Sequence, residues 1–351
     1  MARRILILGA SYGSLLGTKL AMAGHDVTLV CRDKTAALIK EQGTVVRIQL
    51  RGEDEHREIH SGNLPGKVDA TTPEAARPAD YDLVALAMQE PQYSAPPLAR
   101  LLAAIGKAKV PCLSIMNMPP LPFLKRLPDL DVSMLSEAFS DPQIWEDFEP
   151  GLVTLCSPDP QAFRPPEEAA NVLHVGLPTN FKAAAFEDPA HTAMLHELAD
   201  DIDAVRLDDH DVPVKLRVHD SVFVPLAKWS MLMTGNYRCV TATGSRPIRD
   251  AVHGDLDASA SIYHDVDAIA RKMGAEADDQ VPFEKYAKAA EGLLKPSSAA
   301  RAIDSGATSI ERVDKVVQLI GRAVGITNAD IDRTVDTVDK RLVANAAEAA
   351  A

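Results

Sequence analysis

The stretch that decides the fold is ILILGASYGSLLG, residues 5–17. Its first four residues are apolar on both faces, which is typical of a parallel strand covered by helices on either side. Helical spacing of apolar residues follows over residues 14–23, and residues 27–30 form a second apolar run. A strand, a glycine turn, a helix and a second strand within about 30 residues indicate a βαβ unit.

The alternation of strands and helices continues outward from this unit through the first half of the chain. Further strands are predicted at residues 83–88 and 110–116, with a helix over residues 98–105 between them. Residues 44–50 and 56–60 alternate in polarity like an antiparallel pair. This rhythm predicts an α/β fold with a Rossmann-type, doubly wound parallel sheet.

The second half of the chain is predicted to form a separate, mostly α-helical domain. At 351 residues the chain exceeds what one hydrophobic core usually organises. The predicted division is a dinucleotide-binding domain over residues 1–208, a connection over 209–220, a helical substrate and catalytic domain over 221–345 and a tail over 346–351. The proline-rich residues 140–180 are interpreted as an insertion in the first domain.

The composition excludes several classes of partner. The net charge of −13 argues against nucleic acid and against an anionic membrane surface, which both need a basic face. The four cysteines are far apart in sequence, so we expect reduced thiols, a cytoplasmic location and no metal site. No stretch has the roughly 18 apolar residues of a membrane span, and the apolar run near the N-terminus is too short for a signal peptide.

The turn after the first strand is the first candidate site. It has the spacing G-x-x-x-G-x-x-x-G, which is one residue shorter than the usual dinucleotide fingerprint. Glycine lets the backbone approach a pyrophosphate, and the following helix supplies unpaired N–H groups. The predicted cofactor-binding residues of the turn are Gly9, Ala10, Ser11, Tyr12 and Gly13. The alternative is a tight turn with a structural role only.

The end of the second strand indicates which cofactor is bound. An acid there would bind the ribose 2′-hydroxyl of NAD, whereas an arginine suits the 2′-phosphate of NADP. Arg32 comes first and Asp33 follows it, so we expect NADP, with NAD less favoured. The alternative is that Arg32 is a solvated loop residue.

Several separated motifs together form a family pattern. They are Gly24-His25-Asp26-Val27 with Arg32, Asp82-Leu83-Val84 to Met88, Met116-Asn117, Lys228 with Asn236, Lys295-Pro296-Ser297-Ser298, and Asp304 with Gly306 and Thr308. On these motifs the chain resembles the ketopantoate reductase (2-dehydropantoate 2-reductase) family over most of its length. The resemblance implies a two-domain, NADP-dependent oxidoreductase that reduces a 2-oxo acid or a related carbonyl compound.

The resemblance also implies which residues do the chemistry. Reducing a ketone requires a proton on the carbonyl oxygen, and an ammonium group in apolar surroundings is a good donor because burial lowers its pKa. Lys228 is therefore the predicted general acid, assisted by Asn236 and Asn117. Ser298 is expected to bind a substrate carboxylate. Gln89 falls where the family has a lysine that holds the cofactor phosphate.

Each of these residues also has a plainer interpretation. Lys228 could extend its ammonium group to solvent, as lysines commonly do. Asn236 could only end a helix beside Gly235, and Asn117 could only form a turn before prolines. Ser297 or Ser298 could serve as a helix N-cap.

The chain departs from the family pattern at positions that contact the substrate. The family's second asparagine falls on Leu232, and its C-terminal acid falls on Ser309, unless a gap places Glu311 there. We therefore expect a carbonyl substrate other than ketopantoate. An opine-type, imine-reducing dehydrogenase and a non-catalytic NADP-sensing protein remain as alternatives, and a homodimer is left open.

Overall fold

The structure is a computed structural model that describes residues 1–350, and the chain divides into two compact units. Unit 1 consists of Met1–Met88, Gln92–Arg126 and Gln143–Val222. Unit 2 consists of Gln89–Pro91, Leu127–Pro142 and the residues from Phe223 onward. This division differs from the sequence prediction in two places. The expected connection at 209–220 lies inside unit 1, because its last residues form an edge strand, and residues 127–142 belong to unit 2.

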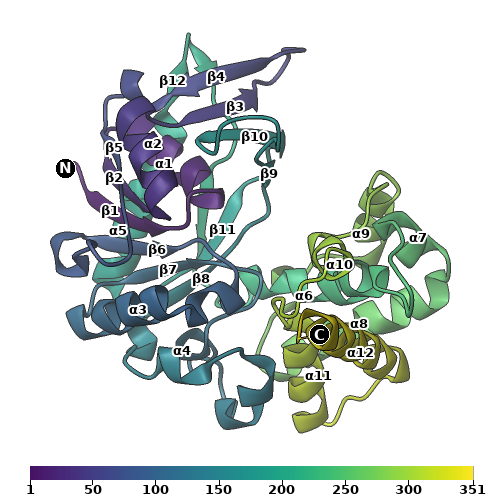
Figure 1. The fold of residues 1–351 in the computed structure, drawn as a ribbon. Helices are drawn as coiled ribbons and strands as arrows, with labels where there is room; N and C mark the ends of the chain where they lie inside the picture. Colours follow the sequence, from purple (N-terminus) through teal and green to yellow (C-terminus); the bar gives the residue numbers. More distant parts are fainter. Residues whose placement is uncertain (351) are drawn as a thin grey trace. The chain divides into compact units, whose positions relative to one another are not determined.

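Unit 1 is built on an eight-stranded sheet (Figure 1). In chain order its strands are β1 (Arg4–Leu8), β2 (Asp26–Val30), β5 (Val68–Thr71), β6 (Leu83–Leu86), β7 (Cys112–Ile115), β8 (Val153–Ser157), β11 (Phe181–Ala184) and β14 (Leu216–His219). Six of them are parallel, in the spatial order β5-β2-β1-β6-β7-β8. This is the 3-2-1-4-5-6 order of the Rossmann fold. The predicted fold class is confirmed.

The proline-rich residues 140–180, interpreted above as an insertion, contain strands of both sheets of unit 1. Strand β8 comes from this segment and is the sixth parallel strand, paired with β7 on one side and β11 on the other. The rest of the segment supplies β9 (Gln161–Phe163) and β10 (Val172–Leu177). These two strands extend the predicted antiparallel pair β3 (Val45–Gln49) and β4 (His56–His60) into a second sheet, of order β4-β3-β10-β9.

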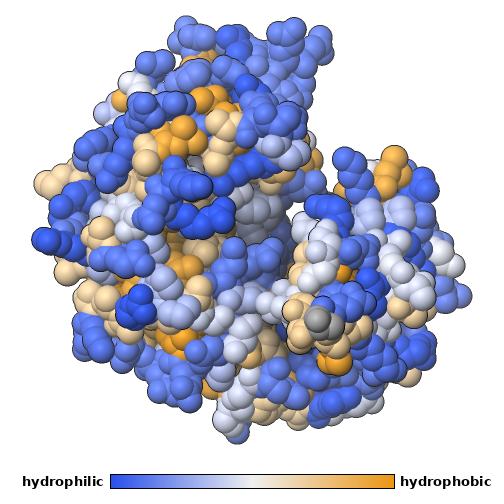
Figure 2. All heavy atoms as spheres, viewed as in Figure 1, coloured by the Kyte–Doolittle hydropathy of each residue, from blue (hydrophilic) through white to orange (hydrophobic). Residues whose placement is uncertain are grey.

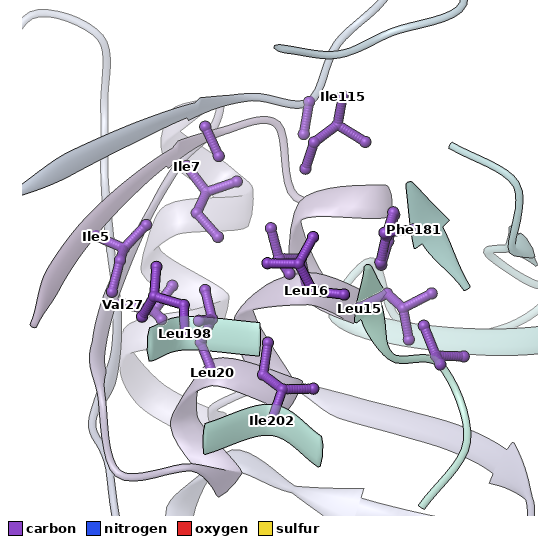
Figure 3. Close-up of a cluster of buried hydrophobic side chains, with 14 of the residues drawn as sticks. Ile5, Ile7, Leu15, Leu16, Leu20, Val27, Ile115, Phe181, Leu198 and Ile202 are labelled. Carbon is purple, nitrogen blue, oxygen red and sulfur yellow. The ribbon is translucent and has the colours of Figure 1, made fainter. Parts of the chain in front are cut away.

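Helix α1 (Tyr12–Met22) occupies the centre of the unit 1 core. Figure 3 shows Leu15, Leu16 and Leu20 of α1 between strand residues such as Ile5 and helix α5 (Pro189–Ala204). All three leucines are buried, and burying a leucine side chain stabilises a fold by roughly 1.5–3 kcal/mol. The other elements of unit 1 are α2 (Asp33–Gln42), α3 (Pro96–Ala108), α4 (Leu121–Leu124), β12 (Arg206–Leu207) and β13 (His210–Asp211).

Unit 2 is helical, as the sequence predicts. Besides the short helix α6, which is described below, its α-helices are α7 (Ile248–His253), α8 (Leu256–Lys272), α9 (Phe283–Ala290), α10 (Ser298–Asp304), α11 (Val313–Ala323) and α12 (Ala329–Ala350). Helix α11 packs against both α8 and α12. The tail predicted from residue 346 differs from the structure, because α12 continues to Ala350. Residue 351 lies outside the described residues.

The apolar segment that opens unit 2 is not one regular helix. It runs from a 3₁₀ turn, η7 (Val224–Ala227), through one α-helical turn, α6 (Lys228–Met231), into a π-helical turn, η8 (Leu232–Asn236), and ends in a 3₁₀ turn, η9 (Tyr237–Cys239). Pro225 lacks an N–H and contributes to the tight first turn. π-Helical turns inside helices are rare and are frequent at functional sites.

Short 3₁₀ turns lie between several of the helices and strands given above. The other 3₁₀ turns are η1 (Ser61–Asn63), η2 (Pro78–Asp80), η3 (Glu90–Ser94), η4 (Val132–Ala138), η5 (Pro142–Trp145), η6 (Pro150–Leu152) and η10 (Ala277–Asp279).

Figure 2 shows small hydrophobic patches separated by hydrophilic residues on the visible face of each unit. None of the helices described has both the length and the apolar character needed to cross a bilayer.

Candidate cofactor and catalytic sites

The glycines of the turn after β1 are required by close approaches. Gly9 has φ +101°, and a Cβ there would lie 2.7 Å from the carbonyl oxygen of Ala87 and from Cγ of Met88. A Cβ on Gly13 would lie 2.7 Å from Cγ2 of Ile7. The first glycine therefore lets the turn pass against the end of β6, and the second lets α1 pack directly on β1. These are the roles that glycines have in a dinucleotide-binding turn.

The charge around this turn suits an anionic ligand. The first turn of α1 contains no acidic residue, and the N-terminal end of a helix carries a partial positive charge. Leu8 of β1 pairs with Val30 of β2, so the chain segments that follow these two strands leave the sheet at neighbouring points. Arg32 is exposed and stands at the N-cap of α2, two residues after Val30. The glycine turn thus fits the backbone of a nicotinamide dinucleotide, with Arg32 at the end of the neighbouring strand.

Arg164 also belongs to this region, and the sequence analysis missed it. It directly follows β9, and its Nη2 donates a hydrogen bond to the carbonyl oxygen of Ala10. Burial lowers the pKa of the Arg164 guanidinium; Cys31 raises it and Arg32 lowers it. No sequence signal connects Arg164 with Arg32, because only the second sheet brings β9 to the glycine turn.

The other sequence-predicted residues of the cofactor region follow β6 and β7. Asn117 is half-buried and lies two residues beyond β7. Since β1, β6 and β7 are parallel, it stands at the same edge of the sheet as Gly9, which is where ligands of such sheets bind. Gln89 follows Met88 directly and is exposed.

The residue after Gln89 is a buried acid that the sequence analysis did not single out. Glu90 is fully buried in unit 2. Its carboxylate accepts hydrogen bonds from the backbone N–H and the hydroxyl of Ser140, both at 3.0 Å. Burial raises the pKa of Glu90 to about 7, against the lowering effect of these hydrogen bonds.

Lys228 and Asn236, the predicted catalytic residues of unit 2, stand at the two ends of the segment formed by α6 and η8. Lys228 is half-buried at the start of α6, and Asn236 is half-buried at the end of η8. Eight residues of regular α-helix would leave the two side chains about 80° apart around the axis. A π turn contains more residues per turn, so it brings Asn236 closer to the face of Lys228.

A tyrosine from α9 supports the π-helical turn. The hydroxyl of Tyr286 donates a hydrogen bond to the carbonyl oxygen of Met231 at 3.0 Å. A Cβ at Gly235 would lie only 2.0 Å from that hydroxyl oxygen. Gly235 therefore leaves room for the tyrosine, and the tyrosine takes up a carbonyl that the irregular helix leaves accessible.

The two serines before α10 have different roles. Ser297 is buried and is the N-cap of α10, since its Oγ accepts from the N–H of Ala300 at 3.1 Å. The same Oγ donates to the carbonyl oxygen of Asn236 at 2.7 Å. The N-cap interpretation is therefore confirmed for Ser297. Ser298 is exposed and begins α10, so Ser297 holds it close to the end of η8.

The structure also separates the two candidates for the C-terminal acid. Ser309 is exposed, whereas Glu311 is buried. The hydroxyl of Tyr237 donates to the carbonyl oxygen of Glu311 at 2.5 Å and accepts from the N–H of Val313 at 3.1 Å. Because Tyr237 follows Asn236, this contact ties the backbone of Glu311 to the segment that contains Lys228 and Asn236. Among residues 1–350, no group of three or more His, Cys, Asp and Glu is placed to hold a metal ion.

Comparisons with known proteins agree with this arrangement. Residues 5–117 match the family described as ketopantoate reductase PanE/ApbA. A search of curated proteins finds no match.

The whole fold matches solved structures at low sequence identity. A protein from Ralstonia solanacearum MolK2, provisionally named a ketopantoate reductase, has a TM-score of 0.72 and 19% identity, with 99% of each chain covered. D-mandelate dehydrogenase in complex with NADH and anilino(oxo)acetate has a TM-score of 0.64 and 15% identity, covering 98% of this chain and 99% of that one. A dimeric ketopantoate reductase from Staphylococcus aureus has a TM-score of 0.58 and 11% identity, covering 97% and 99%.

These findings agree with the architecture of the two units. The structural neighbours show the two-domain fold, and the family match covers the glycine turn, Arg32 and Asn117. Residues 5–117 therefore match the ketopantoate reductase PanE/ApbA family, and the whole chain shares the fold of these structural neighbours.

Proposed function

We propose that the protein is an NADP-dependent reductase of a 2-oxo acid or a related carbonyl compound. The observation that carries this proposal is the glycine turn after β1 with Arg32 at the end of the neighbouring strand β2. The turn admits a dinucleotide backbone, and the arginine is the residue type that suits a 2′-phosphate. The fit to a PanE/ApbA domain supports the same reaction class.

In this proposal the residues of unit 2 donate the proton and bind the substrate. The bound cofactor supplies the hydride. Lys228 donates a proton to the carbonyl oxygen of the substrate as general acid. Asn236 and Ser298, which the Ser297 contact holds near each other, orient the polar groups of the substrate. Glu311 is preferred to Ser309 as the substrate-binding acid, because it is tied to the same segment.

The first test is cofactor binding and turnover with the purified protein. Calorimetric titration is expected to show tighter binding of NADPH than of NADH. A panel of 2-oxo acids should then reveal at least one compound that drives NADPH oxidation. Equal or tighter binding of NADH would contradict NADP dependence. Turnover only after an added amine would favour the opine-type reaction, and binding without turnover on any compound would favour a sensing role.

The substrate is proposed to differ from ketopantoate. Leu232, where the family has an asparagine, is buried inside η8, and Ser309 is exposed. Each lost partner for a buried substrate hydroxyl costs about 1–3 kcal/mol, which favours a larger or more hydrophobic carbonyl compound. Steady-state kinetics should give a kcat/KM for ketopantoate below about 10⁵ M⁻¹s⁻¹. A higher value would show that ketopantoate is the substrate.

Assembly and location are part of the same proposal. A dimeric relative from Staphylococcus aureus shares the fold, so we expect a homodimer, which light scattering after size-exclusion chromatography would detect. None of the four cysteines forms a disulfide among the described residues, and three of them are buried. Reduced thiols suit a cytoplasmic protein, and fractionation of the source cells would test this.

A further inference from the structure

Arg164 reaches the glycine turn from a part of the chain that follows the sixth parallel strand. It is half-buried, and its Nη2 donates to the Ala10 carbonyl between Gly9 and Ser11. Strand β9, which it follows, pairs with β10, and β10 pairs with β3. The inner face of this second sheet packs into the same core as α1, through Ile48 and Leu173 among others. The position of Arg164 is thus set by packed secondary structure.

The surroundings of Arg164 are positive. Burial lowers the pKa of the Arg164 guanidinium, Cys31 raises it, and Arg32 lowers it, so both Cys31 and Arg32 lie near Arg164. The N-terminal end of α1 begins two residues after Ala10 and adds a partial positive charge. Within residues 1–350 neither Arg32 nor Arg164 takes part in an ion pair. Arg47 on β3 and Arg57 on β4, in the second sheet, both do. Two guanidinium groups and the N-terminus of α1, whose first turn has no acid, form a site for a multiply charged anion, although Asp33 follows Arg32 in the first turn of α2.

We propose that Arg164 shares the 2′-phosphate of NADP with Arg32 and thereby determines cofactor choice. This inference rests on the proposed NADP dependence and adds a second arginine to it. Arg164 takes the role of the family's lysine, whose position is Gln89 here. A planar guanidinium binds a phosphate through two parallel hydrogen bonds. Arg32 approaches the phosphate from the end of β2 and Arg164 from the second sheet.

The experiment compares affinities for NADPH and NADH, measured by calorimetry, in the wild type and in Arg164→Met. Methionine removes the charge and retains much of the side-chain length. Losing a charge-assisted contact should weaken NADPH binding by about 10- to 100-fold. NADH binding should change by less than about threefold, because NADH has no 2′-phosphate. Arg164→Lys retains the charge but not the planar guanidinium that can donate two parallel hydrogen bonds. Its affinity for NADPH should lie between those of Arg164→Met and the wild type.

The matched control is Arg57→Met on β4, whose guanidinium is paired with Glu53. It should leave both affinities unchanged. Equal losses for NADPH and NADH in Arg164→Met would assign Arg164 to the pyrophosphate and overturn the proposal, as would no loss at all. If the wild type prefers NADPH, Arg32→Met abolishes the preference and Arg164→Met retains it, only the role of Arg164 is wrong. If the wild type does not prefer NADPH, the proposed cofactor itself is wrong.

Discussion

The hydroxyl of Tyr286 lies 2.0 Å from the position that a Cβ on Gly235 would take. The same hydroxyl donates a hydrogen bond to Met231, one turn earlier in the segment. The π-helical turn and the tyrosine from α9 are therefore matched to each other. Because this turn sets the relative orientation of Lys228 and Asn236, the contact links packing in unit 2 to the proposed chemistry.

Gly235→Ala is expected to destabilise the protein and lower turnover. The added methyl group collides with the Tyr286 hydroxyl, and overpacking of this kind costs about 1–3 kcal/mol. Tyr286→Phe alone should cost about 1 kcal/mol, the usual contribution of one hydrogen bond. Denaturant unfolding measures both changes, and kcat reports the effect on the proposed roles of Lys228 and Asn236.

The double variant Gly235→Ala/Tyr286→Phe supplies the control. It removes the oxygen that the methyl group would meet, so it should be more stable than the sum of the two single changes predicts. The rescue will be partial, since Cγ2 of Ile248 also lies 3.0 Å from that position. Strict additivity would show that the two residues do not depend on each other.

Lys228→Ala is expected to lower kcat by at least about 100-fold, the scale of general acid catalysis. NADPH should still bind with nearly unchanged affinity, which separates a catalytic loss from misfolding. Lys285→Ala removes an exposed lysine of α9 and serves as the comparison. Near-normal turnover in Lys228→Ala would show that another group donates the proton.

Lys19 makes stability depend on pH. It is 2% exposed within α1, and its Nζ donates to the carbonyl oxygen of Val212 at 3.0 Å. Burial, followed by the nearby Lys215, lowers its pKa from 10.5 to about 7. The unfolded chain therefore binds more protons at this residue between about pH 7 and pH 10.5. The contribution of Lys19 to stability rises over that interval and is lost as the pH falls through 7.

Lys19→Met should remove this dependence. Between pH 7 and pH 9 the wild type should gain about 2 kcal/mol of unfolding free energy that the variant does not gain. Urea unfolding at several pH values measures the difference, with Lys285→Met as the exposed control. Parallel pH profiles for wild type and Lys19→Met would contradict the lowered pKa.

Glu90 should give a dependence of the opposite sign. Its pKa in the folded protein is raised from 4.5 to about 7 by burial, so the folded state binds its proton more tightly. The stabilising contribution is complete below about pH 4.5 and is lost as the pH rises through 7. Glu90→Gln keeps a carbonyl acceptor for the Ser140 N–H. In the same unfolding measurement, its free energy of unfolding should change less between pH 5 and pH 8 than that of the wild type. An unchanged slope would show that Glu90 is ionised in the folded protein throughout this range.

Local sequence determined the Rossmann core. The continuous apolar run of β1, the glycines that follow it and the leucine stripe of α1 are signals within 20 residues, and each element forms where its own pattern predicts. The place of Arg32 at the end of β2 could likewise be predicted, because recognising a strand in the sequence also identifies the residues that follow it. The N-cap role of Ser297 follows from its position after Pro296 in the same way.

Tertiary structure alone decided the features that depend on long-range pairing. The apolar pattern of residues 153–157 is compatible with a strand, but only the pairing with β7 and β11 makes them the sixth parallel strand of the sheet. Arg164 came to the glycine turn through the second sheet, and Tyr286 matched Gly235 from another helix. A periodic pattern reports which face of an element is buried, but it does not report which distant element covers that face. Shape and hydrogen bonding between packed elements selected those partners.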